Sequence, residues 1–360
     1  MSITRLSAKP LYEQLKDTLR RQILEGELQP GVLMPSERQL CEQHEVSSTT
    51  VRRALQELVR EGLVRRRAGL GTFVSTKIRR RILLIVVGFE KPAWRERSYF
   101  FSDLIAGIAA ATWESSAIFS VVHVEDSVES LVSSMIEEMA YDGFLLRLEG
   151  DLEDEYLIPL LETGFPYVVI KRYAPHRPIN CVVVDDEQIA IRATNHLIEL
   201  GHTRIGLIST QNVVHGRDRY QGYLKALESR GLDIDPSLIC LAKDYYEEHG
   251  FEAAAKLLAL RDRPTAIFAA SDLLAVGAYS AIEEAGLRIP EDISVVGCAD
   301  IPAAVSLSPP LTTIRVPYYD LGLEATKLLL DLICNSAQPP KKITIGHELV
   351  VRESCGRLRV

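Results

Sequence analysis

Residues 34–74 carry two helix-start signals and a glycine-tipped basic segment in a fixed order, and this order constrains the fold more than any other feature. Ser36 and Gln39 form a Ser-x-x-Gln capping box, which starts a helix at Ser36. A second capped helix is predicted to start at Ser47 and to stop at Gly62. The following segment, Val64–Val74, is typical of two short strands around a glycine tip. The sequence therefore predicts two capped helices and a hairpin in one small domain.

Each predicted helix has one apolar face. In the first, which begins at Pro10 and ends before Gly26, apolar residues recur every four positions. In the helix that begins at Ser47, the residues predicted to be buried are Val51, Ala54, Leu55, Leu58 and Val59. The outward face of the same helix then presents Ser48, Thr49, Arg52, Arg53 and Gln56.

The outward face of this helix has the chemistry that binds nucleic acid. Hydroxyls and free N–H groups at a helix N-terminus hold phosphate, and arginine reaches phosphate or a guanine edge in the major groove. Each of these elements taken alone is more simply interpreted as an ordinary capped helix that binds nothing. The three elements in this order favour DNA binding.

The charge of the chain is divided unevenly between its parts. Residues 1–81 contain 16 Lys+Arg against 9 Asp+Glu, whereas the remainder contains 25 against 40. A basic head on an acidic body fits a head that binds a polyanion, although the net charge of the whole chain is −8. A merely solvated basic surface is the alternative interpretation.

The head resembles the winged helix-turn-helix of GntR-type bacterial repressors. The resemblance covers nearly all of residues 9–75 and is carried by Pro10–Gln14, Pro35–Arg38, Val46–Leu58 and Gly69–Val74. It implies an α+β domain that binds double-stranded DNA. At Ser48 relatives often have an arginine, so the base sequence that they recognise is not carried over. The implied DNA-binding residues, with Ser48 included, are Arg38, Ser47, Ser48, Thr49, Thr50, Arg52 and Gly69.

Cysteine usage and hydropathy exclude several classes of protein. The six cysteines are scattered and form no Cys-x-x-Cys pair, so neither a metal site nor a redox role is predicted. Residues 1–6 have no apolar signal core, and the longest apolar run, Ile82–Val87, is too short to span a bilayer. We expect a cytoplasmic protein without a cofactor. Residues 76–81 are predicted to be a linker, either touching the DNA backbone or purely solvated.

Residues 82–360 alternate apolar, β-rich runs with helical stretches. Continuous apolar strands joined by crossover helices predict parallel sheets covered on both faces, with ligands bound at the carboxyl ends of the strands. The length of this body favours two lobes with a cleft between them. The predicted strands are Ile82–Val87, Ile118–Val124, Gly143–Leu146, Tyr167–Ile170, Val182–Val184, Ile205–Ile208, Ala266–Phe268 and Ile293–Val296, and the predicted helices include Asp103–Glu114, Glu187–Leu200, Asp218–Arg230 and Asp272–Ala285.

The body resembles the effector-binding core of LacI/GalR-type repressors, which are related to periplasmic sugar-binding proteins. Its fusion to a GntR-type head is similar to the arabinose-repressor group. The resemblance implies two Rossmann-like lobes, a homodimer formed largely by the bodies, and chain crossings near Asp185, Pro317 and Asn335. Lobe 1 would contain about 82–184 and 317–334, and lobe 2 about 185–316 and 335–360. The segments that carry the resemblance are Val183–Asp186, His196–Gly206, Arg217–Tyr223, Ala270–Gly277, Pro290–Gly297 and Pro310–Ile314.

The residues aligned with the ligand site of that family depart from its neutral-sugar pattern. Arg219 keeps an arginine that holds ligand oxygens in the family, and Ser271-Asp272 replaces an Asn-Asp pair. Two carboxylate positions of the family are occupied here by Ala299 and Lys171. The effector-binding residues that the resemblance implies are Arg147, Lys171, Arg219, Ser271, Asp272 and Asp300.

Two hypotheses on the charge of the effector follow. Convergence of Arg147, Lys171 and Arg219 carries a large desolvation cost unless an anion fills the cleft, which favours a sugar phosphate or a sugar acid. Alternatively, Arg147 and Lys171 point to solvent or pair with acids such as Glu149, and a neutral sugar binds.

The sequence as a whole predicts a ligand-responsive repressor rather than an enzyme. It contains no Gly-x-Ser-x-Gly, Walker or His-Glu-x-x-His motif. Two heads on a dimer are expected to read a palindromic operator, and the effector is expected to release it, although a ligand that tightens DNA binding is an open alternative. The rival functions are an enzyme or a solute-binding transport protein acting on a sugar-like ligand. The transport protein would need a secretion signal and has no use for the head.

Overall fold

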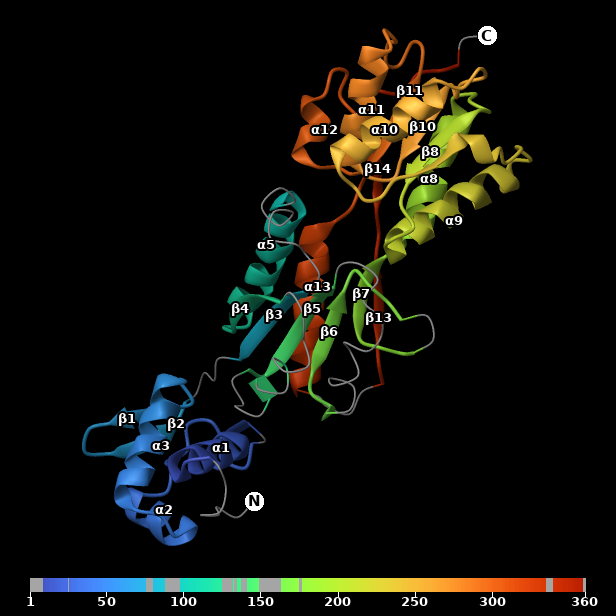
Figure 1. Cartoon of the computed structure of the whole chain (residues 1–360). Coiled ribbons are helices and arrows are strands. Elements are labelled where there is room, and N and C mark those ends of the chain that lie inside the picture. Colours follow the sequence, from blue (N-terminus) through green and yellow to red (C-terminus); the bar gives the residue numbers. More distant parts are fainter. Residues whose placement is uncertain are drawn as a thin grey trace. The chain divides into compact units, whose positions relative to one another are not determined.

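The computed structural model describes most of the chain as two compact units. The described residues are 9–24, 26–75, 80–87, 98–124, 132, 135–136, 141–148, 163–174, 177–334 and 339–358. One unit contains the described residues within 1–82, 112–120 and 134–142, and the other those within 83–111, 121–133 and 143–360. Figure 1 shows the helices and strands of both units, coloured along the chain.

The head contains three helices and a two-stranded hairpin. The helices are α1 (Leu11–Leu24), α2 (Glu37–His44) and α3 (Ser48–Arg60), and the strands are β1 (Val64–Arg67) and β2 (Gly71–Val74). The strands are antiparallel, with Val64 opposite Val74 and Arg67 opposite Gly71. One apolar core joins all five elements, because the leucines of α1 pack with the buried faces of α2, α3 and the hairpin. The predicted order of two capped helices and a hairpin is confirmed.

The predicted burial of α3 is confirmed at four positions and wrong at one. Val51, Ala54, Leu55 and Leu58 are at most 1% exposed, whereas Val59 is 38% exposed. The first four lie at helical spacing on one stripe, and Val59 lies at the edge of that stripe in the last turn of the helix. There the core no longer covers it.

The first of two six-stranded sheets forms lobe 1 of the body, with the strand order β13-β7-β6-β5-β3-β4. Strand β5 runs parallel to β6, β6 to β7, and β7 to β13. Helix α13 packs against the central strands β5, β6 and β7. The elements of lobe 1 are β3 (Arg81–Val87), α5 (Ser98–Glu114), β4 (Ile118–Val124), β5 (Gly143–Leu148), β6 (Tyr167–Ile170), β7 (Cys181–Val184), α13 (Tyr318–Cys334) and β13 (Lys342–Ile345).

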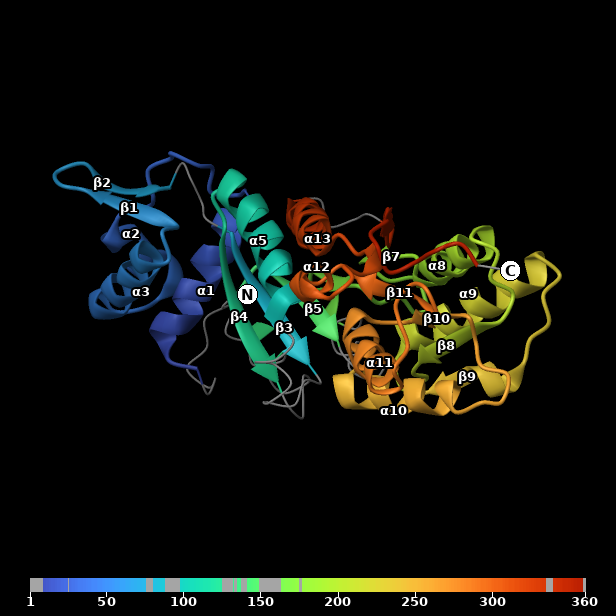
Figure 2. The ribbon, with the colours of Figure 1, turned by 90° about the horizontal axis from the view of Figure 1, so that it is seen from above.

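The second sheet forms lobe 2, with the strand order β14-β12-β11-β10-β8-β9. Five of its strands are parallel, and β14 pairs antiparallel with β12. Helix α8 packs with α9, and α10 packs with α11 on the other face of the sheet (Figure 2). The elements are α8 (Asp186–Glu199), β8 (Ile205–Ser209), α9 (Val214–Ser229), η2 (Pro236–Leu238), β9 (Ile239–Leu241), α10 (Glu247–Leu258), β10 (Ala266–Ala269), α11 (Asp272–Glu284), β11 (Ser294–Ala299), α12 (Pro302–Ser306), β12 (Thr312–Arg315) and β14 (Glu348–Val350).

The chain crosses between the lobes three times, and one of the predicted crossings is misplaced. The crossings at Asp185 and at Val316–Pro317 agree with the predictions. The third falls at Gly346–His347, between β13 and β14, and not at Asn335, which lies outside the described residues. After α13 the chain adds β13 beside β7 of lobe 1 before it leaves that lobe. Residues 339–345 therefore belong to lobe 1 and not to lobe 2.

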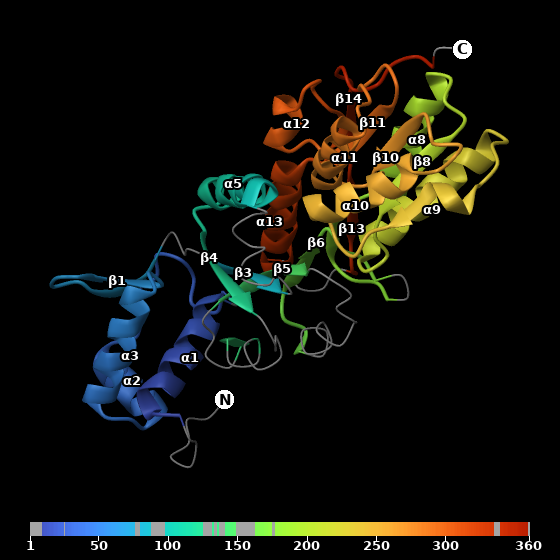
Figure 3. The same cartoon turned by 45° about the horizontal axis from the view of Figure 1, so that its top comes forward.

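Two glycines bring α5 and α13 together in lobe 1 (Figure 3). A Cβ atom at Gly107 of α5 would overlap the carbonyl oxygen of Tyr319, and one at Gly322 of α13 would overlap that of Leu104. The missing side chains let the two helix backbones touch. This contact fixes the start of α13, where Tyr318 lies.

None of the helices in the described residues combines the length and the apolar composition that a membrane-spanning helix needs.

Candidate functional site

The N-terminus of α3 presents a row of hydroxyl groups. Ser47 is the N-cap: its Oγ accepts a hydrogen bond from the Thr50 N–H at 3.2 Å and lies 2.8 Å from the Thr50 Oγ1. Ser48 and Thr49 follow in the first turn, and both are exposed. The structure thus brings together the four hydroxyl residues that were predicted to bind DNA. Their position at a helix N-terminus suits a phosphate group.

The two predicted DNA-binding arginines are exposed and each contacts a glutamate. Arg38 Nε donates to Glu42 Oε1 at 2.9 Å, and Arg52 Nε donates to Glu37 Oε2 at 2.9 Å. A third arginine of the same surface, Arg66 of the hairpin, reaches Glu37 Oε1 at 3.3 Å. The sequence did not predict a role for Glu37, because nothing in its spacing shows that α2 would lie beside α3 and β1.

The hairpin has the geometry of a wing with a backbone tip. Gly69 and Gly71 have φ values of 74° and 109°, which only glycine adopts without strain. Leu70 between them is 65% exposed. Arg67, the last residue of β1 before the tip, lies over the Phe73 ring of β2, with its guanidinium 5.2 Å from the ring centroid. The tip therefore combines two glycine turns with one exposed leucine, and Gly69 lies at the turn where it was predicted.

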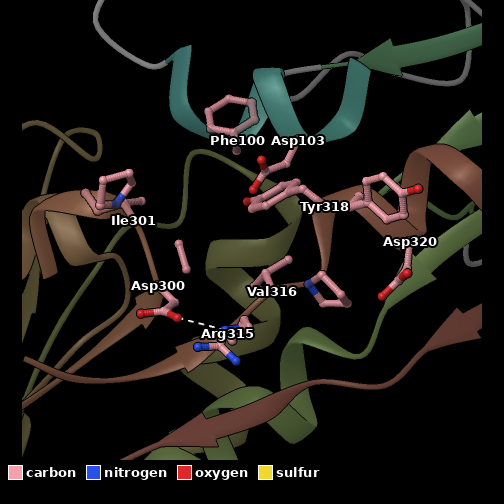
Figure 4. A pocket seen from close by; sticks show the side chains of 12 residues that line it. Phe100, Asp103, Asp300, Ile301, Arg315, Val316, Tyr318 and Asp320 are labelled. Carbon is pink, nitrogen blue, oxygen red and sulfur yellow. Dashed lines mark hydrogen bonds and ion pairs between the residues drawn. The ribbon is translucent and has the colours of Figure 1, made fainter. Parts of the chain in front are cut away.

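A pocket lies where lobe 1 and lobe 2 meet, beside the crossing at Val316–Pro317 (Figure 4). Its volume is about 260 Å³. Phe100 of α5 and Tyr318 of α13 form its aromatic wall, with ring centroids 5.2 Å apart. Its other lining residues include carboxylates and one arginine: Asp103, Asp300, Arg315 and Asp320. Aromatic surface with a few fixed polar groups is typical of sites for small polar molecules.

Lys171 reaches this pocket through Tyr318. Its Nζ donates to the Tyr318 hydroxyl at 3.1 Å and lies 5.1 Å from the centroid of that ring. Lys171 has a φ of 60° directly after β6, so a left-handed turn directs its side chain. Among the residues that the structure describes, the Lys171 ammonium group makes its hydrogen bond to Tyr318 and forms no ion pair with a carboxylate.

Arg219 is buried in an ion pair within lobe 2. Its Nε and Nη2 donate to Asp186 Oδ1 at 2.9 and 2.6 Å, and its Nη1 donates to the Ala270 carbonyl oxygen at 2.5 Å. Burial raises the pKa of the Cys298 thiol to about 11, whereas the nearby Arg219 and Lys171 lower it. Two predicted effector residues therefore lie close to one thiol, but the charge of Arg219 is already compensated by Asp186.

Asp272 has both carboxylate oxygens engaged inside lobe 2. Oδ1 accepts from the Thr313 hydroxyl at 2.6 Å and Oδ2 from the Ile301 N–H at 2.9 Å. Burial raises the pKa of Asp272 to about 6, while these hydrogen bonds lower it. The carboxylate thus ties α11 to β12 and to the loop after β11. Its neighbour Ser271 is the N-cap of α11.

Asp300 lines the pocket and is held by two arginines. Arg315 Nε donates to Oδ2 at 2.8 Å and Arg352 Nη2 to Oδ1 at 2.6 Å. Asp300 has a φ of 59°, and its side chain lies among the lining residues beside Arg315 (Figure 4). Arg315 also bonds Glu348 at 2.9 Å, so the network links β12 to β14 beside the crossings.

Arg147 lies at the end of β5 and is 4% exposed. Its Nη1 donates to the Leu148 carbonyl oxygen at 2.8 Å. The alternative that Arg147 points to solvent is therefore wrong, and its suggested partner Glu149 lies outside the described residues. The sequence did not single out Asp186, which bonds Arg219, or Phe100 and Tyr318, which line the pocket. Asp186 and Tyr318 directly follow two chain crossings, and this position is a signal that could have found them, whereas nothing in the sequence marks Phe100.

Within the described ranges, no cluster of three or more His, Cys, Asp and Glu residues could hold a metal ion. The features that remain are a basic winged head and a two-lobed body with a polar pocket beside its chain crossings. A head that suits DNA, joined to a body that suits a small molecule, defines the class of effector-controlled transcriptional regulators.

Comparison with known proteins identifies the family. Residues 11–74 match the gntR family of bacterial regulatory proteins, and residues 194–355 match the periplasmic binding protein-like domain. The arabinose metabolism transcriptional repressor of Geobacillus stearothermophilus is 29% identical over 96% of this chain and 97% of its own. The probable HTH-type transcriptional repressor ExuR of Bacillus subtilis is 32% identical over 72% of this chain and 77% of its own.

A solved structure agrees with these relatives. The transcriptional regulator CelR in complex with cellobiose has a TM-score of 0.69 and 27% identity, over 96% of this chain and 100% of its own. The chain belongs to this family of transcriptional repressors, with a gntR-type DNA-binding head and a periplasmic-binding-protein-like body as in LacI-type regulators. It is a DNA-binding repressor that responds to a small-molecule effector, and not an enzyme.

Proposed function

We propose that this repressor acts as a homodimer on a palindromic operator and releases it when a neutral, sugar-like effector enters the pocket at Tyr318. The observation that carries the proposal is the pocket itself. Aromatic and carboxylate groups from both lobes meet there, directly beside a chain crossing (Figure 4). A ligand that contacts both lobes favours one lobe arrangement, and the energy of that preference is available to alter DNA binding.

In this proposal the head contacts DNA through the first turn of α3, the arginines beside it and the wing. The exposure of Ser48, Thr49 and Arg52 supports a helix that enters the major groove with its N-terminal residues leading. The contacting residues are Arg38, Ser47, Ser48, Thr49, Thr50 and Arg52, with Gly69 at the wing tip.

The pocket lining favours a neutral polyhydroxylated effector over an anion. Asp103, Asp300 and Asp320 supply acceptors for sugar hydroxyls, and Arg315 supplies donors. The argument for an anionic effector required three converging, uncompensated cations. Arg219 is no longer one of them, because Asp186 compensates its charge. Two relatives support a sugar: one is a repressor of arabinose metabolism, and one is a regulator solved in complex with cellobiose.

The six predicted effector residues then divide by role. Asp300 contacts the effector directly, and Lys171 contacts it beside the Tyr318 hydroxyl. Arg147, near the end of β5, and Ser271, after β10, are not among the residues that line this pocket. Arg219 and Asp272 hold α9, α11 and the adjoining loops in place through their internal bonds.

An exposed apolar surface on lobe 1 supports the homodimer. Trp113, in the last turn of α5, is 87% exposed, and Ile118, the first residue of β4, is 45% exposed. An exposed tryptophan next to an apolar edge strand is typical of a surface that a partner covers. Sedimentation of the wild type and of W113E tests this surface. We expect the wild type to be a dimer and W113E to shift toward the monomer. A monomeric wild type contradicts the homodimer.

A thermal-shift screen tests the effector class on the full-length protein. The panel contains neutral pentoses, hexoses and disaccharides, each with its acid or phosphate where one exists. We expect stabilisation by a neutral sugar that is lost in D300N. Stabilisation by a phosphate or an acid, with none by the parent sugar, contradicts the neutral effector and restores the anionic one.

A further inference from the structure

One acidic side chain lies in the middle of the basic DNA-binding surface of the head. Glu37 is the first residue of α2 and contacts arginines from two other elements. Its Oε2 accepts from Arg52 of α3 at 2.9 Å, and its Oε1 lies 3.3 Å from Nη2 of Arg66 of β1. These two oxygens thus connect the recognition helix to the wing. The Glu37 carboxylate also lies at the N-terminus of α2, where the helix dipole favours a negative charge.

These ion pairs contribute little to stability. The side chains of Glu37, Arg52 and Arg66 are 38%, 63% and 45% exposed. Exposed ion pairs contribute roughly 0–1 kcal/mol, because water screens both charges. These side chains also have no role in the core of the head, because that core consists of apolar residues. The consequence of this arrangement therefore lies in the surface that the head presents to DNA.

The carboxylate affects two different kinds of DNA contact in opposite ways. A negative charge beside Arg52 and Arg66 reduces their attraction to phosphates, which dominates binding to any sequence. The same carboxylate fixes the direction of the Arg52 guanidinium, and a fixed guanidinium pairs with a base edge at a lower entropic cost. Glu37 and Arg66 also line a cavity of about 510 Å³ between α2 and the wing tip.

We propose that Glu37 is a specificity-determining positioning residue, which orients Arg52 toward a base edge and weakens the attachment of Arg52 and Arg66 to phosphates of non-operator DNA. The proposal rests on the recognition surface given under the proposed function. Glu37 would thus affect which DNA sequence is bound through its contacts with arginines, without touching a base itself.

The test compares binding of full-length protein to an operator and to non-operator DNA. The operator is the duplex that wild type selects from a randomised library, and the other probe is a shuffled duplex of the same composition. The variants are E37Q and E37A, with E37D as the conservative variant. E57Q is the matched control, because Glu57 on the same helix as Arg52 pairs with Arg60 at 2.9 Å and not with Arg52.

We expect E37Q and E37A to bind the shuffled duplex several-fold more tightly and the operator no better, so that the ratio of the two affinities falls about tenfold. We expect E37D to retain a larger part of the ratio, and E57Q and all melting temperatures to stay unchanged. An unchanged ratio in E37Q, or parallel weakening on both duplexes with a lower melting temperature, overturns the proposal. The variant R52A distinguishes a failure of this proposal from a failure of the proposed function. If R52A does not affect operator binding, the proposed recognition surface itself is wrong.

Discussion

Arg219 and Asp186 form a buried ion pair in which two nitrogens of the guanidinium donate to the same carboxylate oxygen, at 2.9 and 2.6 Å. Asp186 is the first residue of α8, directly after the crossing at Asp185, and Arg219 belongs to α9. The third bond of the arginine ends on the carbonyl oxygen of Ala270, after β10. The pair therefore fixes three segments of lobe 2 beside one chain crossing, and it supplies the negative charge that the sequence did not predict near Arg219.

Removing one member of this pair is expected to destabilise the body strongly. D186N leaves the guanidinium buried without a counter-charge, which costs about 3–5 kcal/mol of unfolding free energy. Urea denaturation of the full-length protein measures the loss. E187Q is the matched control: it removes the neighbouring exposed pair with Lys225 and is expected to cost under about 1 kcal/mol. A cost in D186N as small as that of E187Q would show that the pair is unimportant for stability.

Because of Asp272, the unfolding free energy is expected to fall as the pH rises. Burial raises its pKa from 3.8 to about 6, so between about pH 4 and 6 the folded chain binds a proton that the unfolded chain has lost. The unfolding free energy then falls as pH rises through this window, by up to about 3 kcal/mol, and this contribution stays constant above it.

The measurement is the slope of the unfolding free energy between pH 4 and 6 in wild type and D272N. The slope is expected to be less negative in D272N, whatever the absolute stability of that variant. D292N is the control, since hydrogen bonds from Arg288 lower the pKa of Asp292 to about 2, which lies outside the window. Equal slopes in wild type and D272N would contradict the raised pKa.

Gly322 is expected to link helix packing to effector binding. A methyl group at this position overlaps the Leu104 carbonyl oxygen, so G322A pushes α13 away from α5 at a cost of about 1–3 kcal/mol. Because Tyr318 lies one turn earlier on α13, the ring pair with Phe100 opens and the affinity for the effector falls. G346A places the same methyl group in open space and is expected to leave the melting temperature unchanged. Equal melting temperatures and affinities for the two variants would refute this link.

The sequence predicted local features of the fold well, because those features have local causes. The capping box at Ser36, the cap at Ser47 and the turn at Gly69 are each determined by residues within a few positions. The eight predicted strands are all present, because each is a mostly apolar run. Strands β9, β12, β13 and β14 were not predicted from periodicity, since they are short runs or, like Thr312–Arg315, contain polar and charged residues.

Contacts between distant residues were harder to predict. The partner of Arg219 is 33 positions away, and the partner of Lys171 is 147 positions away. No pattern along the chain specifies such pairs, because they depend on how the sheets bring strand ends together. For the same reason one of the two sequence-based hypotheses had three uncompensated cations in the cleft, whereas in the structure Asp186 compensates Arg219. The misplaced third crossing has a similar origin, since β13 joins lobe 1 through its pairing with β7.

The central claim, that an effector in the pocket at Tyr318 controls DNA binding by the head, is tested most directly by measuring both affinities in one linkage cycle. Fluorescence anisotropy gives the operator affinity of the full-length protein with and without the sugar that stabilises it most, and calorimetry gives the sugar affinity with and without operator. We predict that the sugar weakens operator binding by about 5- to 150-fold and that the operator weakens sugar binding by the same factor. Operator affinity that stays the same at saturating sugar would contradict the account.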